Sequence, residues 1–220
     1  PATSGASLGG DIRVTLGDGV TEVAREVVDC DGALDTGELY FVADDDLSTT
    51  QSRTYYIYIG NSAAPDYPDA TQYGTHSVWD DDFVLVSHDG GGTDSTSNNN
   101  DGAPQGGVSI GEATGIVGVA TNFDGATQYI NIPDDASLDI TGSLTLSAWI
   151  KVDTVNIEIA GIIAKYADTS TYPLQRSYDF YLEDTGSTVG SMLSDSGLFN
   201  ENGKLVAANT SVPTGAWRHV

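Results

Sequence analysis

The sequence predicts an all-β protein, and three observations support this fold class. Apolar and polar residues alternate in several short stretches, most clearly from Leu144 to Lys151. Successive side chains of a strand point to opposite faces, so this period of two is the pattern of a half-buried strand. The 26 glycines, together with many Thr, Ser, Asn and Asp residues, indicate short strands joined by tight turns. We find no segment with a sustained helical period.

The first 60 residues contain a compact group of predicted strands. The run EVAREVV within the second of these strands also suits a helix, but its β-branched valines and the Gly and Asp residues at both ends favour a strand. Pro65 and Pro68 exclude a regular helix in residues 61–77, which we expect to be a linker. The expected strands are Ile12 to Leu16, Val20 to Val28, Leu39 to Ala43 and Thr54 to Ile59.

From residue 78 onward the pattern of strands and turns continues to the end of the sequence. A loop from His88 to Gly107, rich in Gly, Ser, Asn and Asp, interrupts it, and loops of this length are usually functional or mobile. The expected strands are Val78 to Ser87, Gly115 to Asn122, Tyr129 to Ile132, Leu144 to Val152, Ile159 to Lys165, Tyr178 to Leu182, Val189 to Leu193, Leu205 to Ala208 and Trp217 to Val220.

Several motifs in this second part occur in a characteristic order. They are FDG at Phe123 to Gly125, the run YINIPDDASLDITGSLTLSAWIKV, IIAKY at Ile162 to Tyr166, and TGAWRHV at Thr214 to Val220. In this order they resemble laminin G-like, concanavalin A-like jelly-roll domains. The upstream stretch from Ser77 to Gly102 is similar to the usual beginning of such domains in microbial surface proteins. The resemblance implies a β-sandwich.

The first block carries a second resemblance. Its DIRVT, GELYF and YYIYIGN motifs resemble the C-terminal half of an uncharacterised domain that often precedes laminin G-like domains in archaeal and bacterial surface proteins. We therefore expect a partial N-terminal β domain over residues 1–60, a linker over 61–77 and a jelly roll over 78–220. A sandwich that stops at Val220 would leave a sheet edge and a core face open, so we expect a piece of a longer polypeptide.

The net charge is strongly negative. Asp and Glu number 32 against 8 Lys and Arg residues, which gives a formal net charge of -24. Such a field repels nucleic acids and anionic membranes, so we expect neither as a partner. Two interpretations stay open: a calcium-rich extracellular protein, or a halophilic protein whose carboxylates are screened by salt. The scarcity of Lys and the excess of Asp over Glu favour the second.

Cysteine content and targeting signals give little further information. Cys30 is the single cysteine, so no intrachain disulfide is expected. We find no signal peptide and no apolar run of transmembrane length in the sequence. If the protein is exported, its targeting segment is expected outside this sequence.

The loop from Asp94 to Gly102 carries oxygen-bearing side chains at alternating or nearly alternating positions. Calcium accepts carboxylate, amide and carbonyl oxygens in flexible geometry, and the resemblance to laminin G-like domains implies a calcium ion near a loop edge. We therefore predict Asp94, Asn98 and Asp101 as calcium ligands, with Asp124 as a further partner. The alternative is that all four are hydrated turn residues of an acidic protein.

Catalysis is not expected. Some concanavalin A-like folds are glucanases, which hold two carboxylates about 5 Å apart on one strand face. We find no run close to their Glu-x-Asp-x-x-Glu motif, since Asp80 to Asp82 begin a predicted strand and Glu183-Asp184 end one. The three histidines are scattered, and no nucleophilic serine motif is present.

Aromatic residues near one predicted loop suggest ligand binding. Exposed aromatic rings stack on sugar faces, while Asn and Asp bond the hydroxyl groups. The insertion from Asp168 to Ser177 carries Tyr172 and Arg176, and Tyr166 and Tyr178 flank it. We predict these four residues as the binding set. The alternative for each aromatic ring is packing in the core or against a loop.

These observations lead to one main hypothesis. We expect a non-enzymatic adhesion or recognition module that binds glycans or glycoproteins of a cell envelope. Calcium would assist this binding if the predicted calcium site exists. The module would act on a cell surface or as the tail fibre or spike of a virus. One alternative is a structural subunit that assembles with other copies into an extracellular filament or virion. Another is an accessory domain of a larger secreted hydrolase.

The charge predicts that the fold depends on salt. Lowering the salt concentration below about 1 M lengthens the screening distance beyond about 3 Å and exposes the mutual repulsion of the carboxylates. We expect the melting temperature to fall steadily on dilution, as measured by circular dichroism. A melting temperature indifferent to salt would contradict the halophilic interpretation.

Overall fold

The structure is a computed structural model, and it describes residues 9–31, 36–43, 52–154, 159–167, 175–183, 188–194 and 204–220. The chain forms two compact units. Unit 1 comprises residues 1–123 and 127–133, and unit 2 comprises residues 124–126 and 134–220. The predicted domain limits at residues 60 and 78 do not coincide with this division and stay predictions.

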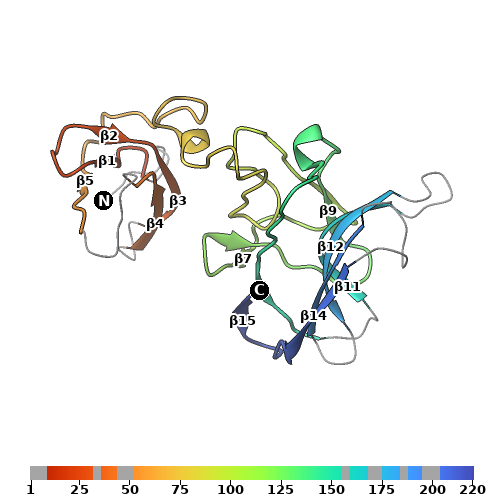
Figure 1. Cartoon of the computed structure of the whole chain (residues 1–220). Helices are drawn as coiled ribbons and strands as arrows, with labels where there is room; N and C mark the ends of the chain where they lie inside the picture. The colour runs from red at the N-terminus through yellow and green to blue at the C-terminus, as the bar shows by residue number, and fades with distance from the viewer. Residues whose placement is uncertain are drawn as a thin grey trace. The chain divides into compact units, whose positions relative to one another are not determined.

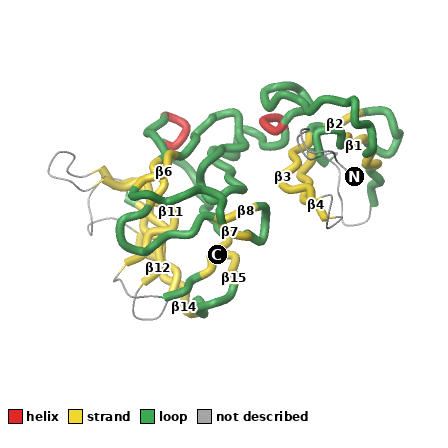
Figure 2. Tube along the Cα trace, turned by 180° about the vertical axis from the view of Figure 1, so that it is seen from behind, coloured by secondary structure: helices red, strands yellow, loops and turns green. Residues whose placement is uncertain are grey.

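The secondary structure is almost entirely β. The described residues form fifteen strands and two short 3₁₀ helices, η1 at Thr75–Ser77 and η2 at Ala136–Leu138. Every pair of neighbouring strands in the described ranges is antiparallel. Figure 2 shows how much loop joins these strands. The prediction of an all-β fold is confirmed.

Unit 1 consists of small sheets. Strands β2-β1-β5 form one sheet, while β3-β4, β6-β9 and β7-β8 form pairs (Figure 1). Val14 on the central strand of the first sheet is completely buried. The strands are β1 (Arg13–Thr15), β2 (Glu22–Val23), β3 (Arg25–Asp31), β4 (Thr36–Phe41), β5 (Tyr56–Tyr58), β6 (Ala103–Gln105), β7 (Ala113–Thr114), β8 (Val119–Ala120) and β9 (Tyr129–Asn131).

The ambiguous segment Val20 to Val28 is a strand region, as predicted, but it divides at Ala24. Strand β2 pairs with β1, and β3 pairs with β4. At the division, the Arg25 N–H donates to the carbonyl of Tyr73, and the Ala24 carbonyl accepts from the Val42 N–H. The chain thus changes sheets at one buried alanine.

The strand predicted over Val78 to Ser87 is wrong. Side chains from a neighbouring loop occupy the backbone groups that a sheet partner would need. Asn98 and Asn100 donate their side-chain amides to the carbonyl of Val84, and Asp94 accepts from the Val86 N–H. Alternating apolar residues cannot reveal this, because the competing hydrogen bonds come from residues farther along the chain.

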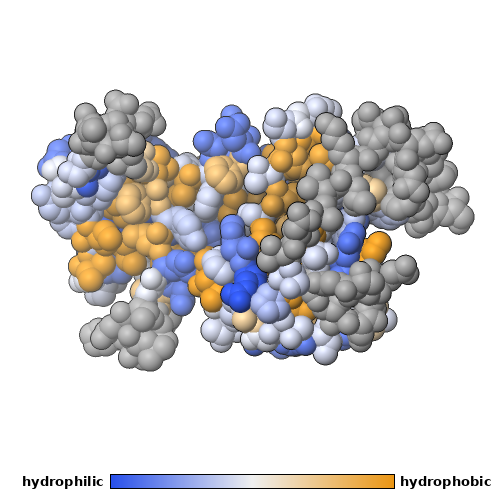
Figure 3. Space-filling model, turned by 60° about the horizontal axis from the view of Figure 1, so that its bottom comes forward, coloured by the Kyte–Doolittle hydropathy of each residue, from blue (hydrophilic) through white to orange (hydrophobic). Residues whose placement is uncertain are grey.

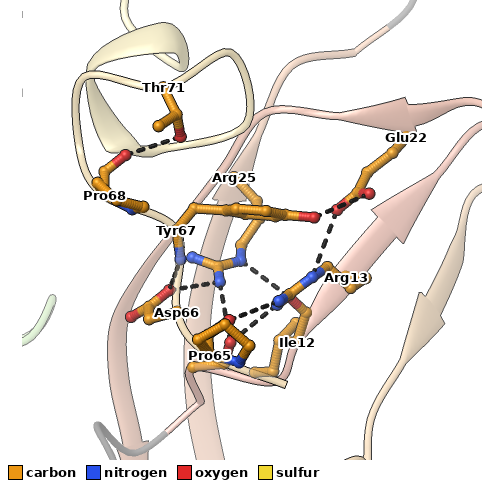
Figure 4. Close-up of polar contacts among 10 residues, drawn as sticks. Ile12, Arg13, Glu22, Arg25, Pro65, Asp66, Tyr67, Pro68 and Thr71 are labelled. Atoms are coloured by element: carbon orange, nitrogen blue, oxygen red, sulfur yellow. Dashed lines mark hydrogen bonds and ion pairs between the residues drawn. The ribbon is translucent and has the colours of Figure 1, made fainter.

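A buried arginine holds part of the predicted linker against the strands of unit 1 (Figure 4). The Arg25 side chain is 3% exposed and donates from Nη2 to the Asp66 carboxylate at 2.6 Å. Its Nε donates to the carbonyl of Ile12 at 2.9 Å. The segment around residue 66 is therefore fixed to β1 and β3 by a charge-assisted pair.

A second arginine strengthens the same attachment. Arg13 donates from Nη2 to the carbonyl of Pro65 at 2.6 Å, and its guanidinium lies 4.2 Å from the centre of the Tyr67 ring. The Tyr67 hydroxyl donates to Glu22 at 3.1 Å. The ring is thus held by a cation–π contact on its face and a hydrogen bond at its edge.

Unit 2 contains a four-stranded antiparallel sheet, in the order β11-β12-β13-β14, and a separate pair, β10-β15. In that pair Trp149 lies opposite His219, with ring centres 5.2 Å apart. Ala148 and Val220 exchange two backbone hydrogen bonds at the same end. The strands are β10 (Trp149–Lys151), β11 (Ile159–Ala167), β12 (Gln175–Glu183), β13 (Thr188–Leu193), β14 (Lys204–Ser211) and β15 (Trp217–His219).

A hydrophobic cluster joins the two sheets of unit 2. Val152, Leu182 and Val212 form its buried centre. Ile150 of β10 packs against it from one side, and Ala160 and Val189 of the four-stranded sheet from the other. This packing is that of a sandwich, in which the core lies between the inner faces of two sheets.

The buried arginine predicts a specific loss of stability. Replacing Arg25 by Met removes the charged donor that bonds the Asp66 carboxylate and the donor to the Ile12 carbonyl. We expect the free energy of unfolding of the full chain to fall by about 2 kcal/mol, in the range for hydrogen bonds to charged groups. Urea unfolding followed by fluorescence measures it. The exposed Arg53→Met is the matched control, and an equal effect of both changes would contradict the structural role of Arg25.

Candidate functional site

The predicted calcium loop is organised around Asp94. This side chain is 3% exposed. Its Oδ1 accepts from the backbone N–H groups of Val86 and Thr96, and its Oδ2 accepts from the Thr96 hydroxyl and the Asn100 N–H, all at 2.8–3.1 Å. Four donors leave the carboxylate little capacity for a cation. In this arrangement the Asp94 carboxylate holds the loop together by bonding Thr96 and Asn100 of the same loop.

The other predicted calcium ligands are also engaged in local bonds. Asn98 donates to backbone carbonyls, Asp101 accepts from the Asp94 N–H at 2.9 Å, and Asp124 accepts from the Ala126 N–H at 2.9 Å. Asp124 belongs to unit 2, whereas the other three belong to unit 1. Among the described residues, no group of three or more His, Cys, Asp and Glu side chains is able to hold a metal ion. Calcium binding stays a prediction.

In unit 2, the predicted ligand residue Tyr166 lies on the surface, with 42% of its area exposed. It borders a shallow depression together with Ser177, Tyr178, Asp179, Met192 and Ser194. Three of these neighbours carry polar side chains. This combination suits a ligand that has an apolar face and several hydroxyl groups.

Tyr178 is placed differently from the prediction. It is 8% exposed, and its hydroxyl donates to the carbonyl of Leu138 at 3.4 Å. Tyr178 alternates with Asp179 along β12, so the two side chains leave opposite faces of the sheet. Tyr172 and the side chain of Arg176 lie outside the described residues.

Asp179 has an unusual environment for a carboxylate. Its Oδ1 is buried and has no hydrogen-bond partner within the part of the chain that the structure describes. Burial raises the pKa of this carboxyl group, although the Phe180 backbone N–H acts in the opposite direction. Buried polar atoms without a partner are few in folded proteins, so this one calls for a physical explanation.

Unit 1 contains a polar cluster that the sequence analysis missed. Glu26 on β3 is 7% exposed. Its Oε1 accepts from the Ser95 hydroxyl at 2.5 Å, its Oε2 accepts from Trp79 Nε1 at 2.7 Å, and His88 Nε2 lies 3.5 Å from Oε2. These partners are more than fifty residues away in sequence, so no local motif announces the cluster.

Aromatic rings enclose the imidazole of this cluster. The Tyr40 ring stacks on His88 with centres 4.9 Å apart and planes 19° apart, and Trp79 lies 5.7 Å from His88. Phe83 packs edge-on against Trp79 at 5.1 Å. His88 therefore lies between the Glu26 carboxylate and the rings of Tyr40 and Trp79.

A hollow of about 200 Å³ adjoins this cluster. Its walls come from β3, from the loop after His88, and from the turn before β8. They consist of Glu26, Val27, Val28, Asp29, His88, Asp89, Thr93, Ser95, Gly118 and Val119.

Two carboxylates beside the hollow, the buried Glu26 and the half-buried Asp89, are stabilised in their charged form. Burial by itself would raise the pKa of Glu26, but the neighbouring His88 and hydrogen bonds from Ser95 and Trp79 outweigh burial and hold the pKa below its ordinary value. The pKa of Asp89 is likewise lowered, because donors on Ser87, Gly92 and Thr93 outweigh its burial. Both groups are therefore ionised at neutral pH.

The Glu26 cluster predicts a loss of stability in acid. Because the folded pKa of Glu26 is lowered, its contribution is present above the unfolded pKa and is lost as the pH falls through the folded value. We expect Glu26→Gln to lower the free energy of unfolding by about 2 kcal/mol at neutral pH. The difference from the unmodified chain should shrink below about pH 4. Urea unfolding at several pH values measures this, with the exposed Glu112→Gln as control. A difference that is constant with pH would contradict it.

Comparison with known proteins gives one match. Residues 124–220, slightly less than half of the chain, match a laminin G family model described as "Concanavalin A-like lectin/glucanases superfamily". The comparison with curated proteins found no match, and neither did the comparison with solved structures. None of the described helices is long and apolar enough to span a membrane. For residues 124–220, the family match confirms the resemblance to concanavalin A-like domains that the sequence motifs indicate.

Proposed function

We propose that this chain is a non-enzymatic recognition module that binds glycans or glycoproteins of a cell envelope through unit 2. The observation that carries the proposal is the exposed Tyr166 ring beside Ser177, Asp179 and Ser194. It lies in the part of the chain that matches the lectin/glucanase superfamily. The match alone is compatible with sugar binding or sugar hydrolysis.

The chemistry of the surface suits a sugar ring. The C–H groups of one sugar face pack on an aromatic ring, while hydroxyl groups and a carboxylate exchange hydrogen bonds with the sugar hydroxyls.

The spacing of acidic residues favours binding over hydrolysis. Asp179 and Glu183 are four residues apart on β12, so they share one face of the strand. At about 3.3 Å per residue their backbones are about 13 Å apart. A retaining glucanase holds its two carboxylates about 5 Å apart, and an inverting one less than about 10 Å apart. These two residues therefore do not suit a hydrolytic pair.

The remaining parts of the proposal concern setting and cofactor. An extracellular location, on a cell surface or a virion, suits the strongly acidic composition and the similarity of the motifs to microbial surface proteins. Calcium assistance is supported by the oxygen-rich composition of residues 94–102. A chelator titration tests calcium directly.

An exposed edge strand favours a second candidate function, the structural subunit. Strand β5 lies at the edge of the β2-β1-β5 sheet; Ile57 on this strand and Ile59 directly after it are 57% and 74% exposed. Figure 3 shows hydrophobic residues at the surface beside hydrophilic ones. Exposed apolar edge strands can pair with another chain, so other copies of this protein are the proposed partner in this alternative.

The recognition proposal predicts that one aromatic ring dominates binding. Tyr166→Ala should weaken retention on an immobilised envelope-glycan column about fivefold, since it removes an aromatic contact worth roughly 1 kcal/mol. Elution by free glycan in high salt measures this. Tyr129→Ala is the matched control, because Tyr129 is an exposed tyrosine of unit 1.

Three outcomes separate the candidates. Retention that depends on Tyr166 supports recognition, and its loss with a chelator adds calcium to the proposal. Assembly into repeating particles without any glycan affinity supports the structural subunit instead. Release of reducing sugars from the column glycan would contradict the non-enzymatic assignment.

A further inference from the structure

The β10-β15 pair of unit 2 carries a group of aromatic and basic side chains that the proposed Tyr166 surface does not include. Trp149 lies opposite His219, and Lys151 lies opposite Trp217. Alternate residues of one strand share a face, and directly paired residues of two strands share it too. These four side chains therefore form one array, which we call the tryptophan array.

The tryptophan array lies on the outer side of its two strands. The opposite side carries Ile150, which packs against the hydrophobic cluster of unit 2. Trp149 is 44% exposed, and Lys151 and His219 are exposed as well. Tryptophan is buried to a large extent on average, and rings of this kind are enriched at binding interfaces. The exposed indole of Trp149 is therefore available to stack on a ligand.

The basic residues of this pair of strands have no acidic partner. Lys165, elsewhere in unit 2, pairs with two carboxylates. Lys151 and Arg218, by contrast, make no ion pair within the part of the chain that the structure describes. Neither strand contains Asp or Glu, and the nearest acidic residue in sequence is Asp153, beyond the end of β10. In a chain with 32 acidic residues, a local excess of positive charge thus stays free for a ligand.

The array combines a stacking surface with a positive charge. The C–H groups of a sugar ring pack on an indole face, and indole and imidazole nitrogens exchange hydrogen bonds with hydroxyl groups. An ammonium group adds a charge-assisted bond to a carboxylate. Opposite residues of an antiparallel pair lie about 5 Å apart, and alternate residues of one strand about 7 Å apart, so the array is comparable in size to one sugar ring.

We propose that the tryptophan array binds an acidic sugar, a hexuronate residue of a carboxylate-bearing polysaccharide. The sugar ring stacks on Trp149, its carboxylate bonds Lys151, and its hydroxyl groups bond His219. Arg218 adds to the positive potential beside the carboxylate. This inference rests on the proposed function in that unit 2 recognises glycans, and it adds a second site with a ligand class of its own.

The test uses three probes on the full chain: trigalacturonate, its trimethyl ester, and acetylated, amidated triglutamate. The ester keeps the sugar rings without the charge, and the peptide keeps the charge without the rings. We expect trigalacturonate at millimolar concentration to shift the indole NMR signals of Trp149 and Trp217 saturably, while Trp79 of unit 1 stays unchanged. The ester should bind at least about threefold more weakly, and triglutamate should cause no saturable shift.

The titrations are run in about 1 M NaCl. The net charge of -24 repels anions at long range, but this salt concentration reduces the screening distance to about 3 Å. Direct contacts between the probe and the array remain, so the comparison of probes reports on the array.

Two pairs of variants locate the binding. Lys151→Gln should reduce the affinity for trigalacturonate to that of the ester and leave the ester unaffected, whereas the exposed Arg53→Gln in unit 1 should change neither. Trp149→Ala should abolish saturable shifts of the Trp217 signal by both sugars, and Tyr166→Ala should leave them unchanged. Lys151 is exposed, so its variant remains informative if Trp149→Ala does not fold.

Several results would overturn the proposal. Equal affinity for trigalacturonate and its ester would show that charge plays no part, and equally tight binding of triglutamate would make the array a site for acidic peptides. Shifts that persist in both Lys151→Gln and Trp149→Ala would place the sugar elsewhere. Absence of any shift up to the solubility limit of trigalacturonate would show that the array is not a binding site.

Failure of this inference is distinguishable from failure of the proposed function. Retention on the envelope-glycan column that depends on Tyr166, without trigalacturonate binding, overturns the array alone. Trigalacturonate binding that depends on Trp149, without column retention, supports the array and contradicts the role of Tyr166.

Discussion

The buried carboxylate of Glu26 imposes the strongest constraint on unit 1. An ionised carboxylate inside a protein is tolerated only when hydrogen bonds replace the water that it has lost. Ser95 and Trp79 provide those bonds, and His88 lies 3.5 Å from the same carboxylate; all three come from segments that are far from β3 in sequence. One side chain therefore fixes the loop after His88 and the segment around Trp79 to the same strand, and it forms one wall of the hollow.

Asp94 has the same effect on a smaller scale. Its carboxylate gathers donors from Val86, Thr96 and Asn100, so a loop rich in Asp and Asn acquires a defined shape without a strand ladder. Arg25 and Asp66 provide the third polar attachment, between the strands and the segment that follows β5. Unit 1 is thus held together largely by buried polar contacts between short strands. Unit 2 depends instead on a hydrophobic cluster between two sheets.

Sequence patterns predicted the strands whose structure depends on residues close by in the sequence. The β-branched residues of β2 and β3 were sufficient to identify strands, whereas the alternation from Leu144 to Lys151 corresponds to a strand only at Trp149–Lys151. Sequence patterns failed for Val78 to Ser87, because the side-chain amides of Asn98 and Asn100 donate to the Val84 carbonyl that a neighbouring strand would need. Of the candidate binding residues, Tyr166 is exposed, as a ligand contact needs, and Tyr178 is buried. The Glu26 cluster was missed because its members share no local motif.

The pairing of β10 with β15 has a consequence for mechanical load. Trp149 lies opposite His219, and the Ala148–Val220 backbone bonds close the same end of the pair. Tension applied along the chain between the residues before Ala148 and Val220 would reach that end first. The hydrogen bonds would then break one after another, as in unzipping, and would not share the load as they do in shear. The aromatic contact of Trp149 and His219 stands at the first point of opening and is the part of unit 2 that resists pulling earliest.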